Sequence, residues 1–332
     1  MMPPLGVALT GRDPVTSFEQ IVAAAHAAEA GGFDFLCLPE RAGLDPIALS
    51  AGLAAVTEHV GLIPACSAPF HQPYNLARRL GSIDHISRGR LGWLLQPTPS
   101  TQEAEHFGNL PLAMPEVAAA RAAELAQVVA GLWDSWDDDA FTRDKASGLY
   151  FDRSRFHWLD HQGTHYKVRG PLDTARPPQG RPPLMVNGGN PIADAFAAAA
   201  AEVLHIVPRH LNEARSMRAA LTRSLADHGR PPGALRILAG ITPASSIVEP
   251  GPLQLAETPS MIAALMAEWC SSGAVDGFVI HLPDTAEAIG TFAAQVMPAL
   301  RQRQLRPDGP RGMLRDRLGL APAPSRHAHR AA

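Results

Sequence analysis

The chain alternates between short apolar runs and longer segments in which apolar residues are spaced as on a helix. The runs are continuous and do not alternate with polar residues, as expected for strands that are covered on both faces. Each run therefore predicts a strand of a parallel sheet. They occupy residues 5–10, 33–39, 60–66, 89–96, 182–188, 203–208, 234–242 and 276–283.

Helical segments separate the predicted strands, and several have recognisable end signals. Ser17 and Gln20 have the spacing of a capping box, at the start of a segment that ends in two glycines. Asp45 followed by Pro46 is a typical helix start. Further helices are predicted within residues 73–87, 116–136, 193–202, 211–229, 258–273 and 284–300.

Eight strands in alternation with helices predict an α/β fold of the (β/α)8 type, the TIM barrel. A doubly wound open sheet is the alternative, but eight matched units fit a closed barrel better. In both folds the active region lies at the C-terminal ends of the strands. We expect residues 1–320 to form a single barrel domain and the low-complexity residues 321–332 to form a flexible tail.

One connection is much longer than the others. Residues 97–181 separate the fourth and fifth predicted strands, where an ordinary unit needs only a short loop and one helix. After its helical part, this segment continues through an aromatic and proline-rich stretch. Long insertions at this face of a barrel usually form a lid or a substrate wall, and we expect the same here.

Composition narrows the class of protein. Apolar residues make up 46% of the 332 residues, enough for a sizeable core, so the body of the chain is not disordered. A net charge of −3 does not suggest a nucleic-acid surface, and no apolar stretch is long enough to span a bilayer. The start resembles no signal peptide, and three scattered cysteines suggest neither disulfides nor zinc. We expect a soluble cytoplasmic protein.

Two clusters of polar residues have the composition of metal sites but simpler explanations. His157, His161 and His165 are four residues apart, so a continuous helix would place three imidazoles on one face. Gly163 interrupts this run, which favours a hairpin with hydrogen-bonding histidines. The acidic run at residues 133–140 is expected to be an exposed helix end. We therefore predict no metal site.

The stretch LMVNGGNP, residues 184–191, is a candidate phosphate-binding turn. It follows an apolar run and precedes an alanine-rich helix, whose free N–H groups and dipole would point toward a bound anion. An ordinary tight turn is the alternative. The chain has no nucleotide-binding glycine motif, no Gly-x-Ser-x-Gly elbow and no cysteine in a nucleophile context. Chemistry supplied by a bound cofactor is therefore favoured.

Several longer motifs occur in order along the chain and resemble one family. The most specific are VRGPL with the following PPQGRPP, and LRDRLGL near the C-terminal end. Others are PYNLARRLGSIDHISRGRLGW, EHFG, GLWDSW and AVDGFVI. Together they resemble the luciferase-like flavin-dependent monooxygenases, in the branch that contains nitrilotriacetate monooxygenase component A and its relatives in sulfur and pristinamycin metabolism.

The resemblance implies a (β/α)8 barrel that binds reduced FMN supplied by a separate flavin reductase. Oxygen then reacts with the reduced flavin, and a small organic substrate is oxygenated. The protein holds the phosphate, fixes the ring system and excludes water. The resemblance also implies a homodimer or homotetramer. From the net charge and the length of the apolar runs, we expect no nucleic-acid or membrane partner.

Polar residues at the predicted active face are candidates for this chemistry. His71 and His281 are the candidate catalytic residues. The candidates for cofactor binding are Glu40, Ser67, Gln96, Thr98, Asn187, Gly188, Gly189 and Asn190.

The chain departs from the family pattern at several flavin positions. Only Ser67 remains of a hydroxyl-rich stretch after the third strand, and Pro191 replaces the phosphate-binding hydroxyl after the fifth. Asp194 stands where the family has a glycine, and its charge would repel a phosphate. The main interpretation is an FMN-dependent monooxygenase with a remodelled flavin site. The alternatives are a related oxidoreductase that uses a deazaflavin or another flavin-like cofactor, and a non-catalytic barrel that serves as a binding or partner subunit.

Overall fold

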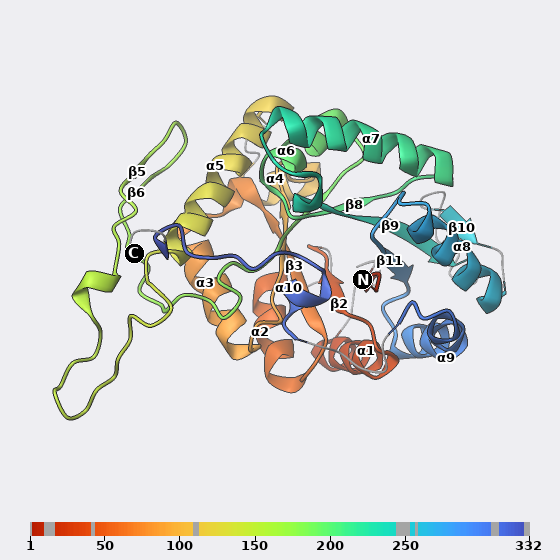
Figure 1. Cartoon of the computed structure of the whole chain (residues 1–332), viewed down its shortest axis with the longest axis horizontal. Helices are drawn as coiled ribbons and strands as arrows, with labels where there is room; N and C mark the ends of the chain where they lie inside the picture. Colours follow the sequence, from red (N-terminus) through yellow and green to blue (C-terminus); the bar gives the residue numbers. More distant parts are fainter. Residues whose placement is uncertain are drawn as a thin grey trace.

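A closed barrel of parallel strands forms the centre of the molecule (Figure 1). The computed structural model describes residues 2–9, 17–40, 44–108, 113–243, 253–255, 258–306 and 312–328. The barrel strands are β1 (Leu5–Leu9), β2 (Phe35–Leu38), β3 (Gly61–Ser67), β4 (Trp93–Gln96), β7 (Leu184–Asn187), β8 (Val203–Ile206), β9 (Arg236–Pro243) and β11 (Gly277–Leu282). They pair in this order, and β1 pairs with β11 to close the ring. The predicted (β/α)8 barrel is confirmed. Each predicted run coincides with one of these strands, and β3 and β9 extend one residue beyond theirs.

Helices surround the barrel, and the predicted end signals operate as expected. Ser17 and Gln20 form both hydrogen bonds of a capping box, and the Asp45 carboxylate accepts the N–H of Ala48. The long helices are α1 (Phe18–Gly31), α2 (Pro46–Val56), α3 (Pro73–Ile86), α5 (Pro115–Trp133), α6 (Pro191–Ala200), α7 (Leu211–Asp227), α8 (Pro259–Ser271) and α9 (Ala286–Gln302). Two short helices, α4 (Thr101–His106) and α10 (Leu314–Arg317), were not predicted. Among the described helices, none has the length and apolarity that crossing a membrane requires.

Three further strands lie outside the eight. β5 (His161–Gln162) and β6 (Lys167–Val168) form a small antiparallel hairpin, as predicted for the histidine-containing segment. β10 (Leu253–Leu255) pairs with the end of β9 and was not predicted. Both additions are peripheral, so they leave the barrel intact.

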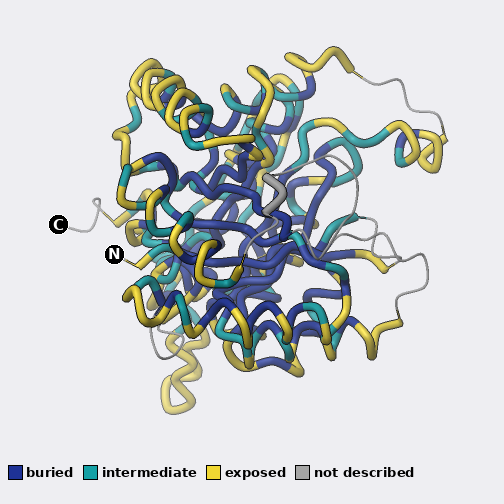
Figure 2. The backbone as a smooth tube through the Cα atoms, turned by 90° about the vertical axis from the view of Figure 1, so that its right-hand side faces the viewer, coloured by how far each residue is buried: buried dark blue, intermediate teal, exposed yellow. Residues whose placement is uncertain are grey.

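The core has two layers of buried side chains, which explains why the strand runs are apolar on both faces. Figure 2 shows the buried part of the backbone at the centre of the molecule. One layer lies inside the barrel and includes Phe35, Ile63 and Met185. The other lies between the strands and the helices. Gly6 on β1 leaves room for the Phe35 ring, because a Cβ there would lie 2.0 Å from an atom of that ring. A strand that packs on both faces cannot show alternation.

The insertion between β4 and β7 begins with α4 and α5, and its later part extends away from the barrel (Figure 1). Asp134 at the end of α5 is fully buried and forms ion pairs with Arg176, Arg181 and Arg326. The prediction of an exposed acidic helix end is therefore wrong for Asp134, although Asp138 nearby is exposed. Three arginines from distant segments compensate the cost of burying this charge.

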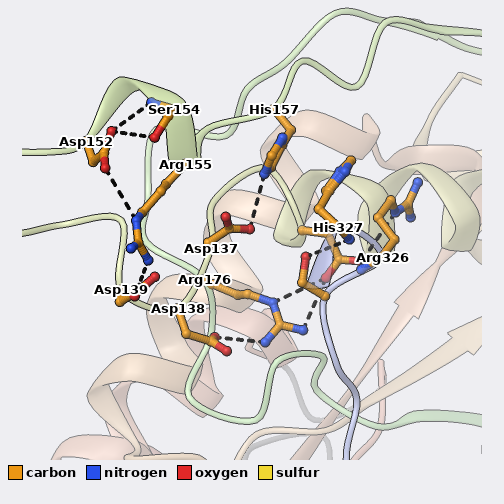
Figure 3. Close-up of polar contacts among 12 residues, drawn as sticks. Asp137, Asp138, Asp139, Asp152, Ser154, Arg155, His157, Arg176, Arg326 and His327 are labelled. Atoms are coloured by element: carbon orange, nitrogen blue, oxygen red, sulfur yellow. Dashed lines mark hydrogen bonds and ion pairs between the residues drawn. The ribbon is translucent and has the colours of Figure 1, made fainter. Parts of the chain in front are cut away.

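The C-terminal segment packs against the insertion instead of extending freely (Figure 3). The Arg326 guanidinium lies 3.3 Å from the Asp134 carboxylate, and the His327 ring stacks on His157 with ring centroids 3.8 Å apart. Ser325 is buried. Residues 325–327 of the predicted tail thus contact other segments, and residues 329–332 lie outside the described part of the chain. That residues 321–332 are flexible stays a prediction.

Candidate functional site

Two adjoining cavities open at the C-terminal ends of the barrel strands. The smaller, of about 240 Å³, lies between the ends of six strands and reaches Cys37, His205 and His281. The larger, of about 500 Å³, lies between the end of β4 and the first turn of α6. Gln96 and Asn187 line both cavities, so the two cavities adjoin at these side chains. This is the end of the barrel at which the fold predicts the active region.

The cavities bring together five of the ten predicted site residues. His281 lines the smaller cavity, and Thr98 and Asn190 line the larger one. Gln96 and Asn187 belong to both. The other predicted residues lie in neighbouring arrangements, described next.

A pair of histidines lies in the smaller cavity. The Nε2 atoms of His205 and His281 are 3.3 Å apart, and Nδ1 of His205 is 3.0 Å from Oδ1 of Asn187. Burial lowers the pKa of His205 to about 3 and that of His281 to about 4. Both rings are therefore neutral near neutral pH, so they can exchange hydrogen bonds with a ligand but cannot neutralise a negative charge.

His205 was missed at the sequence level, although a signal was present. It interrupts the apolar run Val203–Ile206 with a polar side chain that is almost completely buried. A buried imidazole needs hydrogen-bond partners, and strands that lie close together in a barrel can supply them. A second histidine inside another apolar run, His281, was the available hint.

Two carboxylates surround Ser67 at the ends of β2 and β3. The Ser67 N–H donates to Glu40 Oε1 at 3.3 Å, and its hydroxyl donates to Glu103 Oε1 at 2.7 Å. Burial and the nearby Glu103 charge raise the pKa of Glu40 to about 7. Glu103 was missed because it belongs to the unpredicted helix α4, yet its capping-box spacing from Ser100 is visible in the sequence.

His71 is placed differently from the other candidate catalytic residue. It follows a short 3-10 helix (Ala68–Phe70) after β3 and is not among the residues that line either cavity. Burial and the nearby Arg79 charge lower its pKa. Of the two candidate catalytic residues, His281 therefore lines one of these two cavities and His71 lines neither.

The turn between β7 and α6 uses its own side chains to satisfy its N–H groups. The Gly189 N–H donates to Asp194 Oδ1 at 3.1 Å, and the Ala193 N–H donates to Asn190 Oδ1 at 2.9 Å. A Cβ at Gly188 would lie 2.6 Å from Asp194 Oδ1, so this carboxylate can take its place only because residue 188 is a glycine. Pro191 has no N–H to offer. Asp194 therefore already accepts the Gly189 N–H, which a bound anion would otherwise need.

The three histidines of the insertion do not converge. His157 Nε2 lies 3.1 Å from Asp137 Oδ1, and His161 Nε2 lies 3.0 Å from Glu124 Oε1. His165 donates its backbone N–H to Glu124. In the described part of the chain there is no group of three or more histidine, cysteine or acidic residues that could hold a metal ion. His161 and His165 instead connect the β5–β6 hairpin to Glu124 on α5, and His157 contacts Asp137 just after that helix.

Comparisons with known proteins agree with this architecture. A family described as luciferase-like monooxygenase matches residues 4–293. The chain is 38% identical to one of the subunits of pristinamycin IIA synthase from Streptomyces pristinaespiralis, over 98% of this chain and 98% of that protein. It is 30% identical to nitrilotriacetate monooxygenase component A of Aminobacter aminovorans, over 84% of this chain and 79% of that protein. A riboflavin lyase solved with modified FMN and riboflavin superposes with a TM-score of 0.86 at 20% identity, over 98% of both chains.

Proposed function

Because this chain belongs to the luciferase-like monooxygenase family, we propose that it is the oxygenating component of a two-component flavin monooxygenase. In this proposal it takes reduced FMN from a separate flavin reductase and uses oxygen to oxygenate a small organic substrate. The observation that carries the proposal is the pair of adjoining cavities at the C-terminal ends of the strands. TIM-barrel enzymes have their active sites at this end.

The smaller cavity suits an aromatic ring system with polar edges. Its walls include Leu38, Leu94 and Met185, and the amides of Gln96 and Asn187 lie where the two cavities meet. A bound reduced flavin would supply the electrons that activate oxygen. The chain's own contribution would be to orient the ring by amide hydrogen bonds and to exclude water with its apolar walls.

The phosphate of FMN does not fit the β7–α6 turn as it is arranged. Asp194 already accepts the Gly189 N–H, and its carboxylate would repel a phosphate at this position. We therefore assign the ring system to the cavities and no phosphate contact to the turn. This arrangement is the remodelling that distinguishes the proposed site.

The proposal is tested by titrating the purified protein with oxidised and reduced FMN while following flavin fluorescence. We expect saturable binding in the micromolar range, weakened several-fold by Gln96→Ala. Gln302→Ala, at an exposed position at the end of α9, is the matched control and should not change the affinity. Absence of saturable binding at high micromolar flavin, in both redox states, would overturn the proposal.

A second candidate function is a barrel that has no flavin chemistry of its own and acts as a partner subunit. The specific observation in its favour is the Asp194 carboxylate in the candidate phosphate-binding turn. The full-length similarity to a protein named as one component of a synthase is consistent with it. Under this alternative neither FMN nor a deazaflavin binds.

Two further expectations have their own tests. The same titration with a deazaflavin tests the related oxidoreductase, and light scattering tests the expected homodimer or homotetramer.

A further inference from the structure

Two imidazoles meet across a strand that separates them. His205 lies on β8 and His281 on β11, and β9 pairs with both of these strands. A Cβ at Gly240 on β9 would lie 2.7 Å from Nε2 of His205 and 3.0 Å from Nε2 of His281. Any larger residue at this position would therefore force the rings to move. The glycine is what allows the contact of 3.3 Å between the rings.

The direction of each hydrogen bond follows from the chemistry of the groups. A neutral imidazole has one N–H and one bare nitrogen. Oδ1 of Asn187 can only accept, so Nδ1 of His205 has the proton and its Nε2 is bare. A bare nitrogen accepts, so the proton between the two rings belongs to Nε2 of His281. Nδ1 of His281 is consequently bare.

We propose that Asn187, His205 and His281 form an ordered chain of neutral hydrogen bonds that presents Nδ1 of His281 to the strand-end cavity as a hydrogen-bond acceptor. Among the described residues, none hydrogen-bonds to this atom, and His281 lines the smaller cavity. The acceptor selects a ligand group with an N–H or O–H, and it offers nothing to a carboxylate or a phosphate. Asn187 and His205 are positioning residues, because they act through His281.

The role in substrate selection rests on the proposed function, whereas the order of the hydrogen bonds does not. Tautomers are measured on the flavin-free protein by long-range proton–nitrogen NMR of its labelled histidines, of which the chain has 14. His205→Asn and His281→Asn variants assign the two resonance pairs. We expect His281 as the Nε2–H tautomer and His205 as the Nδ1–H tautomer. A single Nδ1–H tautomer at His281 would overturn the proposal.

Substitutions separate positioning from simple packing. Gly240→Ala should push the rings apart and give His281 a mixture of both tautomers. Gly290→Ala, where a Cβ meets no atom within 4 Å, is the matched control and should leave the spectrum unchanged. Asn187→Asp retains an acceptor for His205 and should preserve the order, whereas Asn187→Leu should lose it. An unchanged His281 tautomer in Gly240→Ala contradicts the proposed chain.

The acceptor itself is tested with two probes of similar size. Millimolar phenol, an O–H donor, should shift the His281 Nδ1 resonance, and benzoate, an anion, should not. An equal shift with benzoate, or no shift with phenol, overturns the assignment of the acceptor. A failure of the flavin titration would overturn the proposed function and would leave these NMR results standing, so the two failures are distinguishable.

Discussion

At the residue scale, two carboxylates lie near the strand-end cavities. Asp194 lies in the turn that begins α6, and Glu40 lies beside Ser67 at the end of β2. Both are partly buried, and burial raises the pKa of each. Each carboxylate accepts a backbone N–H group, which partly offsets that cost. Substitution of Asp194 should therefore change ligand binding, and substitution of Glu40 should change how the stability of the fold depends on pH.

Replacing Asp194 by asparagine should increase the affinity for FMN, because it removes a negative charge that repels the phosphate from the β7–α6 turn. We expect about a tenfold tighter dissociation constant, which corresponds to ~1.4 kcal/mol. The affinity for riboflavin, which has no phosphate, should not change. Equilibrium titration by flavin fluorescence measures both.

Asp227→Asn is the control for this experiment, since it makes the same charge change at the exposed end of α7. If Asp194→Asn improves the binding of riboflavin as much as that of FMN, the carboxylate acts on the shape of the site and not through its charge.

Glu40→Gln should make the stability of the folded state less dependent on pH between about 4.5 and 7. The pKa of Glu40 rises from 4.5 to about 7 on folding, so its stabilising contribution is complete below 4.5 and is lost as pH rises through 7. After discounting for partial exposure, we expect the variant to be more stable than the wild type by roughly 1–2 kcal/mol near pH 8, and about equal near pH 4.5. Urea denaturation at a series of pH values measures the difference.

The exposed Glu116→Gln on α5 should show no such trend. A wild-type protein that gains stability relative to Glu40→Gln as the pH rises would contradict the raised pKa.

At the scale of elements, one buried arginine joins the ends of α2 and α3 to the start of β3. The Arg90 guanidinium donates to the carbonyls of Ala54, Thr57, Val60 and Ser87, at 2.8 to 3.0 Å. These carbonyls lie at or beyond helix ends, where no intrahelical donor is left for them. The arginine therefore satisfies acceptors that would otherwise be buried without partners.

Arg90→Met should destabilise the fold by about 2–4 kcal/mol, because it leaves these carbonyls without donors. The free energy of unfolding in urea measures the loss. Arg78→Met, at an exposed ion pair on α3, should change stability by less than about 0.5 kcal/mol. Equal losses in the two variants would show that the buried contacts of Arg90 contribute nothing specific.

The barrel was predictable from the sequence because its signals are local. A run of apolar residues or a capping box depends on neighbours in the chain, and all eight strands and the long helices were found in this way. Short α4 and β10 were missed because too few residues define them. Asp134 was misjudged because its arginine partners lie 42 to 192 residues away in sequence.

The candidate site was predictable only in part, for a similar reason. The location at the strand ends followed from the fold, and Gln96, Asn187 and His281 were found on that basis. The contact between His205 and His281 depends on Gly240 of an intervening strand, and no short pattern reveals it. The Asp194 carboxylate was expected to repel a phosphate, but its bond to the Gly189 N–H required the folded turn.

At the scale of the whole molecule, Asp134 joins three distant parts of the chain. Its carboxylate binds Arg176 and Arg181 from the segment before β7, and Arg326 from the C-terminal segment. His327 adds a stacking contact with His157 in the insertion. The C-terminal segment thus fastens the base of the insertion to the barrel.

Arg326→Gln should loosen the insertion without unfolding the barrel. We expect limited proteolysis between residues 137 and 170 to be several-fold faster, and the unfolding free energy to fall by about 1 kcal/mol. Mass spectrometry of the fragments locates the cleavage. Arg303→Gln, at the exposed end of α9, is the control. An unchanged rate of proteolysis in Arg326→Gln would mean that the ion pair between Arg326 and Asp134 does not hold the insertion in place.

Closing the ring through β1 and β11 has a consequence for biosynthesis. Leu5 pairs with Phe278, so the first strand to leave the ribosome finds its second neighbour only after roughly 270 further residues, or roughly 15–55 s of translation. Until then one edge of β1 has unpaired N–H and C=O groups and apolar side chains. Nascent chains that stall before β11 should therefore be strong clients of ribosome-associated chaperones, and truncations in this region should aggregate instead of forming smaller stable barrels.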